Sequence, residues 1–256
     1  MRILILAALP QEYSPIRKLL PSWRLVEKKP LKKFISRLPG KEIIVIESGM
    51  GAKSVEEALE AQLTTEFTPD LLIFSGFAGG LHPDLPVGAV CFTTSAREIS
   101  SGQVFHFRFP DKLVDFMNQN GIRPVLGLST EQPGNKRTLS ALASGQAAVL
   151  DMETATLARI AFHNKIAFIC FRAISDGIEH DLGFNLNDIA DERGRIRLAG
   201  VLVAVIRKPA TLKAFYLSWR RSRRAARNLC GPVAAFLGIP APVLGKMAEE
   251  IRIERA

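Results

Sequence analysis

The chain has 256 residues, of which 47% are hydrophobic and 23% charged, and its formal net charge is +9. This length and composition suit one folded domain with a sizeable core and exclude an intrinsically disordered chain. Cys91, Cys170 and Cys230 stand far apart, without a CxxC or paired-histidine spacing, so we expect buried reduced thiols and neither a disulfide framework nor a metal site.

Short apolar runs alternate with helical patterns along the first 176 residues. We expect strands at 3–8, 42–47, 71–75, 87–93, 147–150 and 167–173, and helices at 12–20, 52–67 and 153–163. Glycine turns at 49–51 and 76–80 are expected to follow two of the strands. Short buried strands that are each followed by a helix predict an α/β fold. We expect a single domain with a central mixed, mostly parallel sheet flanked by helices.

The most apolar segments are too short to cross a membrane. The run at 3–9 ends at Pro10 and is followed by no small-residue cleavage pattern, so it predicts a buried strand and not a signal peptide. The next longest run, at 198–206, is far below the roughly 20 residues that a spanning helix needs. We therefore expect a cytoplasmic protein.

The positive charge is concentrated near the C-terminus. Residues 193–248 contain Lys and Arg but no Asp or Glu. A helix is predicted at 211–230, with a stop signal at Gly231 and Pro232. We divide the chain into a catalytic domain, 1–205, and a basic helical C-terminal extension, 206–256. Two alternatives stay open: the helix packs its apolar stripe on the body, or Thr211–Arg227 lies on an anionic membrane surface. Nucleic-acid binding is least expected, because no recognised module is present.

Several polar or glycine-rich segments follow the predicted strands directly. They are Glu12, the glycine segments 49–51 and 76–80, residues 151–153, and the Ser175–Asp176 pair. Ligands of parallel α/β sheets bind beyond the carboxyl ends of the strands, so these segments are expected to converge on one crevice. Glu12, Glu153 and Asp176 are candidate site carboxylates, although an acidic residue in a first helical turn also serves as a cap.

Four segments carry a resemblance to a known family. They read ILILAALPQE at 3–12, SGMGAKSVEEA at 48–58, PDLLIFSGFAGGLHPDLPVG at 69–88 and VLDMETATLARIAFHNKIAFICFRAISD at 149–176. In order and spacing they resemble the purine nucleoside phosphorylase and uridine phosphorylase superfamily, particularly its methylthioadenosine/S-adenosylhomocysteine nucleosidase branch. The resemblance implies an enzyme that cleaves the N-glycosidic bond of a purine nucleoside, most specifically a 5′-substituted adenine nucleoside.

The resemblance also implies a role for each matching residue. Asp176 would protonate or hydrogen-bond N7 of the purine, and Glu12 would activate water as the general base. Glu153 would hold the ribose hydroxyls, Met152 would pack on the sugar, and Gly79 would approach the nucleoside. The chemistry agrees, because a departing adenine must gain a proton while a nucleophile attacks the opposite face of an oxocarbenium-like sugar. No cofactor is required.

Two departures from the family pattern leave the nucleophile and the base contacts open. Phe77 stands where the nucleosidases and phosphorylases have a serine, and a phenylalanine cannot hydrogen-bond phosphate. This favours water, although phosphate would be the co-substrate if the chain is a phosphorylase. The segment 94–147 is shorter than the nucleosidase pattern. The candidate base-stacking loop, 127–136, offers Pro133 as a flat apolar surface.

A more specific alternative comes from AGGLHPDL and the basic C-terminal segment, which resemble the hopanoid-associated branch of the superfamily. Members of that branch are thought to remove adenine from adenosylhopane, which would place the protein at the inner face of the membrane. The resemblance also implies a homodimer.

The segment 104–109, VFHFRF, predicts an amphipathic strand or part of a 5′ pocket. Two hypotheses of another class are a non-catalytic nucleoside-binding protein and a membrane- or nucleic-acid-binding protein with a vestigial enzyme body.

Overall fold

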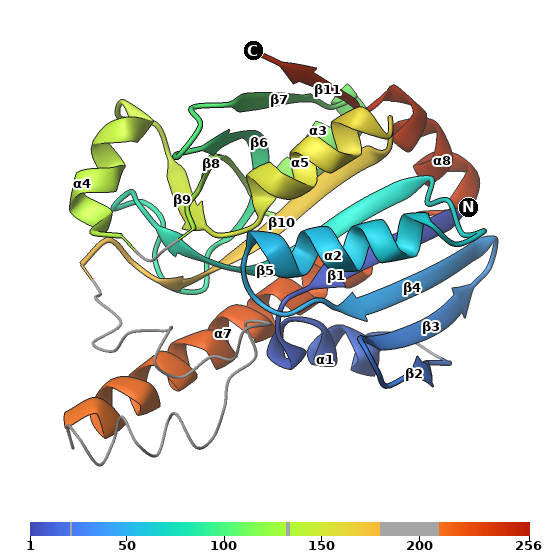
Figure 1. The fold of residues 1–256 in the computed structure, drawn as a ribbon, viewed down its shortest axis with the longest axis horizontal. Coiled ribbons are helices and arrows are strands. Elements are labelled where there is room, and N and C mark those ends of the chain that lie inside the picture. The colour runs from blue at the N-terminus through green and yellow to red at the C-terminus, as the bar shows by residue number, and fades with distance from the viewer. Residues whose placement is uncertain (21, 132–133, 180–209) are drawn as a thin grey trace.

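The structure is a computed structural model that describes residues 1–20, 22–131, 134–179 and 210–256 (Figure 1). The predicted boundary at 205/206 and Pro133 lie outside these residues. The described strands are β1 Arg2–Ala7, β2 Arg24–Glu27, β3 Lys32–Leu38, β4 Lys41–Glu47, β5 Leu71–Gly80, β6 Val90–Glu98, β7 Val104–Arg108, β8 Arg123–Ser129, β9 Ala148–Asp151, β10 Ala167–Asp176 and β11 Arg252–Arg255. The described helices are α1 Pro10–Leu19, α2 Ala52–Leu63, α3 Asp111–Gln119, α4 Lys136–Ser140, α5 Thr154–His163, α7 Ala210–Gly238 and α8 Ala241–Glu250, with a 3-10 turn at Ala141–Ala143.

The strands form one mixed sheet with helices on both faces, which confirms the predicted α/β fold class. Its centre is parallel, with β4, β1, β5 and β10 side by side. Successive side chains of a strand point to opposite faces. In β1, Ile3 and Ile5 belong to the core under α1 and α7, whereas Leu4 and Leu6 belong to the core under α2 and α5. Because both faces are covered, the strand is apolar throughout, as its sequence predicted.

Five strands also close into a ring. β5 pairs with β10, β10 with β6, β6 with β8, β8 with β9, and β9 with the end of β5. A small separate core takes one buried residue from each of these strands: Ala78, Ile174, Cys91, Val125 and Val149. The pairing of β9 with the end of β5 brings Asp151, the last residue of β9, close to the glycines of β5.

The glycine turn expected at 76–80 was wrong. β5 continues through Gly80, because Gly76 pairs with Arg172 and Gly79 with Asp176 on β10, while Gly79 and Gly80 pair with β9. Partners on both sides satisfy the backbone of this segment, which therefore stays extended. β10 likewise runs to Asp176, three residues beyond its predicted end.

The C-terminal helices are confirmed, but the stop predicted at Gly231 and Pro232 was wrong, because α7 runs on to Gly238. Proline inside a helix costs about 3 kcal/mol, since it removes one backbone hydrogen bond and clashes with the preceding turn. Beyond Pro232, Val233, Phe236 and Leu237 are fully buried in the core under α1. Burial of three such side chains offsets that cost.

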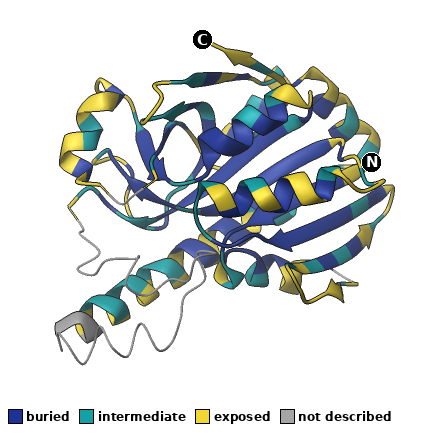
Figure 2. Cartoon of the chain, in the orientation of Figure 1, coloured by how far each residue is buried: buried dark blue, intermediate teal, exposed yellow. Residues whose placement is uncertain are grey.

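The two ends of the C-terminal segment differ in their surroundings. Figure 2 shows α7 changing from half-buried and exposed in its first half to buried where it meets the sheet. After α8, β11 adds an antiparallel strand to β7. The described part of 206–256 therefore contributes both core side chains and a sheet edge to the body of the protein.

The segment 104–109 contains an amphipathic strand, as predicted. Phe105 and Phe107 of β7 are buried, and His106 between them is exposed. The ring of Phe105 lies 6.0 Å from that of Phe162, and Phe107 lies 5.5 Å from Phe168. The two rings therefore pack in the core under α5.

We expect Phe236→Ala to lower the free energy of unfolding by about 3–5 kcal/mol, because the change removes a fully buried ring that contacts Phe116 and Phe171. Tyr216→Ala, at an exposed position of the same helix, should change it by less than about 0.5 kcal/mol. Urea unfolding measures both. Equal effects of the two substitutions would show that α7 is not part of the core.

Candidate active site

Glu12 lies at the third position of α1 and is 3% exposed. One carboxylate oxygen accepts a hydrogen bond of 2.8 Å from the backbone N–H of Leu9, just before the helix. The other accepts a 2.8 Å bond from the backbone N–H of Phe77 on β5. The first bond is a helix-capping interaction, whereas the second ties the carboxylate to the glycine-rich end of the sheet. Glu12 is thus more than a cap.

Arg172 of β10 is 1% exposed and bridges several polar groups. Its guanidinium donates to Asp151 at 2.5 Å and to Glu153 at 3.4 Å. It also donates to the hydroxyl of Thr154 at 2.9 Å and to the carbonyl of Phe77 at 3.3 Å. The guanidinium carbon lies 4.0 Å from the centre of the Phe74 ring, so the cation is packed as well as paired.

Glu153 connects this cluster to the first glycine turn. One of its carboxylate oxygens accepts a 2.8 Å bond from the backbone N–H of Gly51, and the other accepts a 3.2 Å bond from Met152. Gly51 has a φ of +93°, a backbone conformation that favours glycine. The turn at 49–51 therefore donates its Gly51 N–H to Glu153, the carboxylate to which the family resemblance assigns the ribose hydroxyls.

The glycines of β5 make room for these charged groups. A Cβ atom at Gly76 would lie 2.6 Å from the guanidinium of Arg172 and 2.8 Å from the carboxylate of Glu12. The side chain of Phe77 packs on the core under α1, while its backbone N–H and carbonyl contact Glu12 and Arg172. The segment therefore contributes backbone groups, and not a phosphate-binding side chain, to the site.

Asp176 ends β10 and forms an ion pair with Lys136, the first residue of α4. The other carboxylate oxygen of Asp176 accepts a 2.6 Å bond from the hydroxyl of Ser175. Lys136 also donates to the carbonyl of Gly177 at 3.0 Å. A Cβ at Gly79 would lie 2.9 Å from the Lys136 side chain and 3.2 Å from the Asp176 carboxylate. Because Gly79 has no side chain, the ion pair can lie directly against the strand at this position.

The carboxylates differ in how easily they hold a proton. Burial raises the pKa of Glu12 from its ordinary value of 4.5 to about 7, against the opposing effects of the Leu9 and Phe77 N–H groups and Arg172. Burial also raises the pKa of Glu153. For Asp151, burial acts in the same direction but is outweighed by Arg172, Thr154 and Ser129, which lower its pKa. Asp151 is thus the permanent anion of the cluster, and Glu12 titrates near neutral pH.

A family model described as the phosphorylase superfamily matches residues 2–207. The chain belongs to this superfamily. Membership makes the protein an enzyme of the nucleosidase or nucleoside phosphorylase type. It also confirms the resemblance on which the residue roles were based.

Solved structures of the superfamily share the fold at low sequence identity. A Neisseria meningitidis 5′-methylthioadenosine/S-adenosylhomocysteine nucleosidase in complex with methylthio-immucillin-A is 19% identical, with a TM-score of 0.66 over 91% of this chain and 96% of that one. A Helicobacter pylori nucleosidase of the same name is 17% identical, with a TM-score of 0.69 over 93% and 98%. The futalosine hydrolase of Helicobacter pylori is 16% identical, with a TM-score of 0.65 over 92% and 98%.

The five segments expected to share a crevice are joined by contacts in the superfamily fold. Glu12 contacts the glycine segment of β5, the 49–51 turn contacts Glu153, and Asp176 lies against Gly79. Sequence reasoning gave no role to Arg172 or Lys136. Arg172 lies within the quoted RAISD motif, so its position at the end of an apolar strand was a usable signal. Lys136 was the last residue of the proposed base-stacking loop, and no local pattern distinguished it from a surface lysine.

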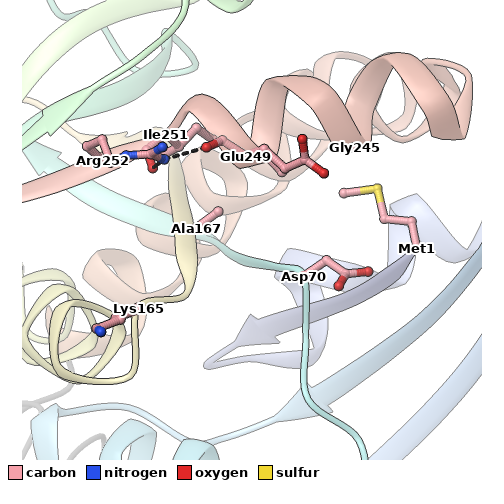
Figure 3. A pocket seen from close by; sticks show the side chains of 9 residues that line it. Met1, Asp70, Lys165, Ala167, Gly245, Glu249, Ile251 and Arg252 are labelled. Carbon is pink, nitrogen blue, oxygen red and sulfur yellow. Dashed lines mark hydrogen bonds between the residues drawn. The ribbon is translucent and has the colours of Figure 1, made fainter.

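A cavity of about 370 Å³ lies at the opposite end of the strands (Figure 3). Met1, Asp70 and Ala167, which line it, stand at the amino ends of β1, β5 and β10, and Glu249 and Arg252 close it from the C-terminal segment. It is therefore separate from the carboxyl-end site. Within the described ranges, no three His, Cys, Asp or Glu residues are grouped to hold a metal ion.

The raised pKa of Glu12 has a consequence for stability. A carboxyl group whose pKa is higher in the folded protein than in the unfolded chain binds protons more tightly when folded. Its contribution to stability is fully present below pH 4.5 and is lost as the pH rises through about 7. A rise of this size corresponds to roughly 3 kcal/mol.

We therefore expect the free energy of unfolding of the unchanged protein to fall by roughly 3 kcal/mol relative to Glu12→Gln between pH 4.5 and pH 8. Urea unfolding at the two pH values measures the difference. Glu57→Gln, which removes an exposed carboxylate of α2, should follow the unchanged protein. If Glu12→Gln also runs parallel to it, the carboxyl of Glu12 is not buried as described.

Proposed function

We propose that this protein hydrolyses the N-glycosidic bond of a 5′-substituted adenine nucleoside and releases adenine, as the 5′-methylthioadenosine/S-adenosylhomocysteine nucleosidases do. The observation that carries the proposal is the placement of two carboxylates along one glycine-rich strand. Glu12 contacts Gly76 and Phe77, and Asp176 contacts Gly79. Three strand residues span about 10 Å, which is the scale of a nucleoside with a water molecule.

The charges around Glu12 support water as the nucleophile. Glu12 has a pKa of about 7, so its ionised form can take a proton from water under neutral conditions. Phosphate is a dianion and would be repelled by this carboxylate. The nearby guanidinium of Arg172 is already engaged by Asp151 and Glu153. We assign the ribose hydroxyls to Glu153 and the sugar face to Met152, by correspondence with the superfamily motif.

We expect Asp176→Asn and Glu12→Gln each to lower the rate of adenine release from methylthioadenosine by about 10²- to 10⁴-fold, the usual contribution of a general acid or base. Asp115→Asn and Glu57→Gln, at exposed positions, are the matched controls. Adenine release is followed with and without phosphate. Free ribose product supports hydrolysis, ribose-1-phosphate supports a phosphorylase, and unaltered rates in both site variants refute the assignment.

The first half of α7 favours a second, more specific proposal, in which the 5′ substituent is a lipid, as in adenosylhopane. Tyr216 and Trp219 are 55% and 48% exposed. Guanidinium groups lie over both rings, Arg220 at 5.9 Å and Arg223 at 4.7 Å. Such a basic, aromatic helix face suits an anionic membrane surface. Within the described residues no single helix has the length and apolarity to cross a bilayer; α7 from Lys213 and α8 meet that test as a pair bent by 101°.

We expect the protein to sediment with vesicles that contain anionic lipid and to remain in solution with neutral vesicles. Replacement of Tyr216 and Trp219 by serine together should lower the bound fraction at least tenfold without changing adenine release from methylthioadenosine. The matched control is Val243→Ser, which removes an exposed apolar side chain from α8. Equal binding by all variants would contradict a membrane role for α7.

A cytoplasmic homodimer remains part of the proposal, and sedimentation of the free protein measures its oligomeric state.

A further inference from the structure

The cavity at the amino ends of the strands has walls from two distant parts of the chain (Figure 3). One wall comes from Met1, Asp70 and Ala167, beside the amino ends of β1, β5 and β10. The other comes from α8 and from Arg252, the first residue of β11. This second wall lies beyond residue 207, where the match to the superfamily model ends. The cavity therefore forms where the C-terminal segment meets the body of the protein.

The charged side chains of the cavity are separated by sign. In Figure 3 the carboxylates of Asp70 and Glu249 lie on the side of Met1, whereas the Arg252 guanidinium and the Lys165 ammonium lie on the other side. Among the residues that the structure describes, none of these four charges has an ion-pair partner. The cavity thus presents two unpaired charges of each sign at separate places.

Backbone hydrogen bonds fix one charge of each sign. The Asp70 carboxylate accepts a 2.6 Å bond from the backbone N–H of Arg2. The Arg252 guanidinium donates to the carbonyl of Glu249 and, at 2.9 Å, to that of Ile251. These carbonyls lie at the end of α8, where a positive charge is favourable. Because both charged groups are oriented in advance, a ligand that pairs with them loses less conformational entropy on binding.

Gly245 keeps the helix wall of the cavity open. It lies inside α8, where glycine is less favourable than alanine. Packing does not require a glycine there, because an added Cβ would meet nothing within 4 Å outside the backbone of its own helix. The position therefore borders the open space of the cavity, and a longer side chain would fill that space without displacing the core.

We infer that this cavity binds a small zwitterion, a molecule with an ammonium group at one end and a carboxylate at the other. The ammonium group lies against Asp70 and Glu249, and the carboxylate faces Arg252 and Lys165. A ligand with both charges satisfies both sides of the cavity. A simple cation or anion pairs with one side and is repelled by the other.

The size of the cavity and its position agree with such a ligand. Its volume of about 370 Å³ falls within the range of small-molecule sites and equals that of about a dozen water molecules. The cavity lies at the opposite end of the strands from Glu12 and Asp176. The inference therefore does not depend on the proposed function, and the ligand is neither the nucleoside nor its products.

Three probes with the same carbon chain test the charge pattern: 6-aminohexanoate, hexylamine and hexanoate. By calorimetry the unchanged protein should bind 6-aminohexanoate about tenfold more tightly than either probe with one charge, because each of these lacks one charge-assisted hydrogen bond. Asp70→Asn should weaken 6-aminohexanoate binding by about tenfold, since its amide oxygen still accepts from Arg2 but the negative charge is lost. Equal affinity for hexylamine or hexanoate would overturn the inference.

A substitution that fills the cavity shows where the probe binds. Gly245→Leu should abolish binding of 6-aminohexanoate. The matched control is Gly231→Leu, at an exposed helical position of α7 where an added Cβ also meets nothing within 4 Å, and it should leave the affinity unchanged. A ligand of the folded protein raises its melting temperature, so 6-aminohexanoate should stabilise Gly231→Leu but not Gly245→Leu. Binding that survives Gly245→Leu, or no binding by the unchanged protein, would refute a zwitterion site here.

Discussion

The site depends on one buried cation. The Arg172 guanidinium lies between Asp151 and Glu153 and also reaches the carbonyl of Phe77, so it connects β9, the start of α5 and β5. Without a positive charge, two carboxylates this deeply buried would each carry the full cost of desolvation. With it, Asp151 is held as an anion, and Glu153 stays close enough to the 49–51 turn to present its oxygens there.

The same arrangement explains the glycines of β5. A strand normally offers its side chains to a ligand, but here side chains from neighbouring elements must reach the strand surface. Gly76 leaves room for Glu12 and Arg172, and Gly79 leaves room for Lys136 and Asp176. The strand thus acts as a narrow spacer between two sets of charged groups. In the proposed reaction, the attacking water and the purine accordingly lie at opposite ends of this short segment.

The C-terminal segment combines a structural role with an exposed, basic one. The second half of α7 supplies Leu229, Val233 and Phe236 to the core that also contains the parallel strands. That anchoring fixes the direction of the first half, where Tyr216 and Trp219 are exposed beside arginines. Because the helix is already ordered at its packed end, its exposed end loses less conformational entropy on binding than a flexible tail would. This is the physical basis for considering the first half as an interaction surface.

The sequence by itself determined the α/β class and the apolar parallel strands β1, β4, β5 and β10, because hydrophobic periodicity is a local property. Its motifs also singled out Glu12, Glu153 and Asp176 as candidate site carboxylates. Tertiary structure decided what local patterns could not. β5 stays extended through its glycines because strands on both sides pair with it. α7 continues beyond Pro232 because burial of the side chains that follow offsets the lost hydrogen bond. It also brought Lys136, forty residues away in the chain, to Asp176, since only the packed fold places a charge from α4 against the end of β10.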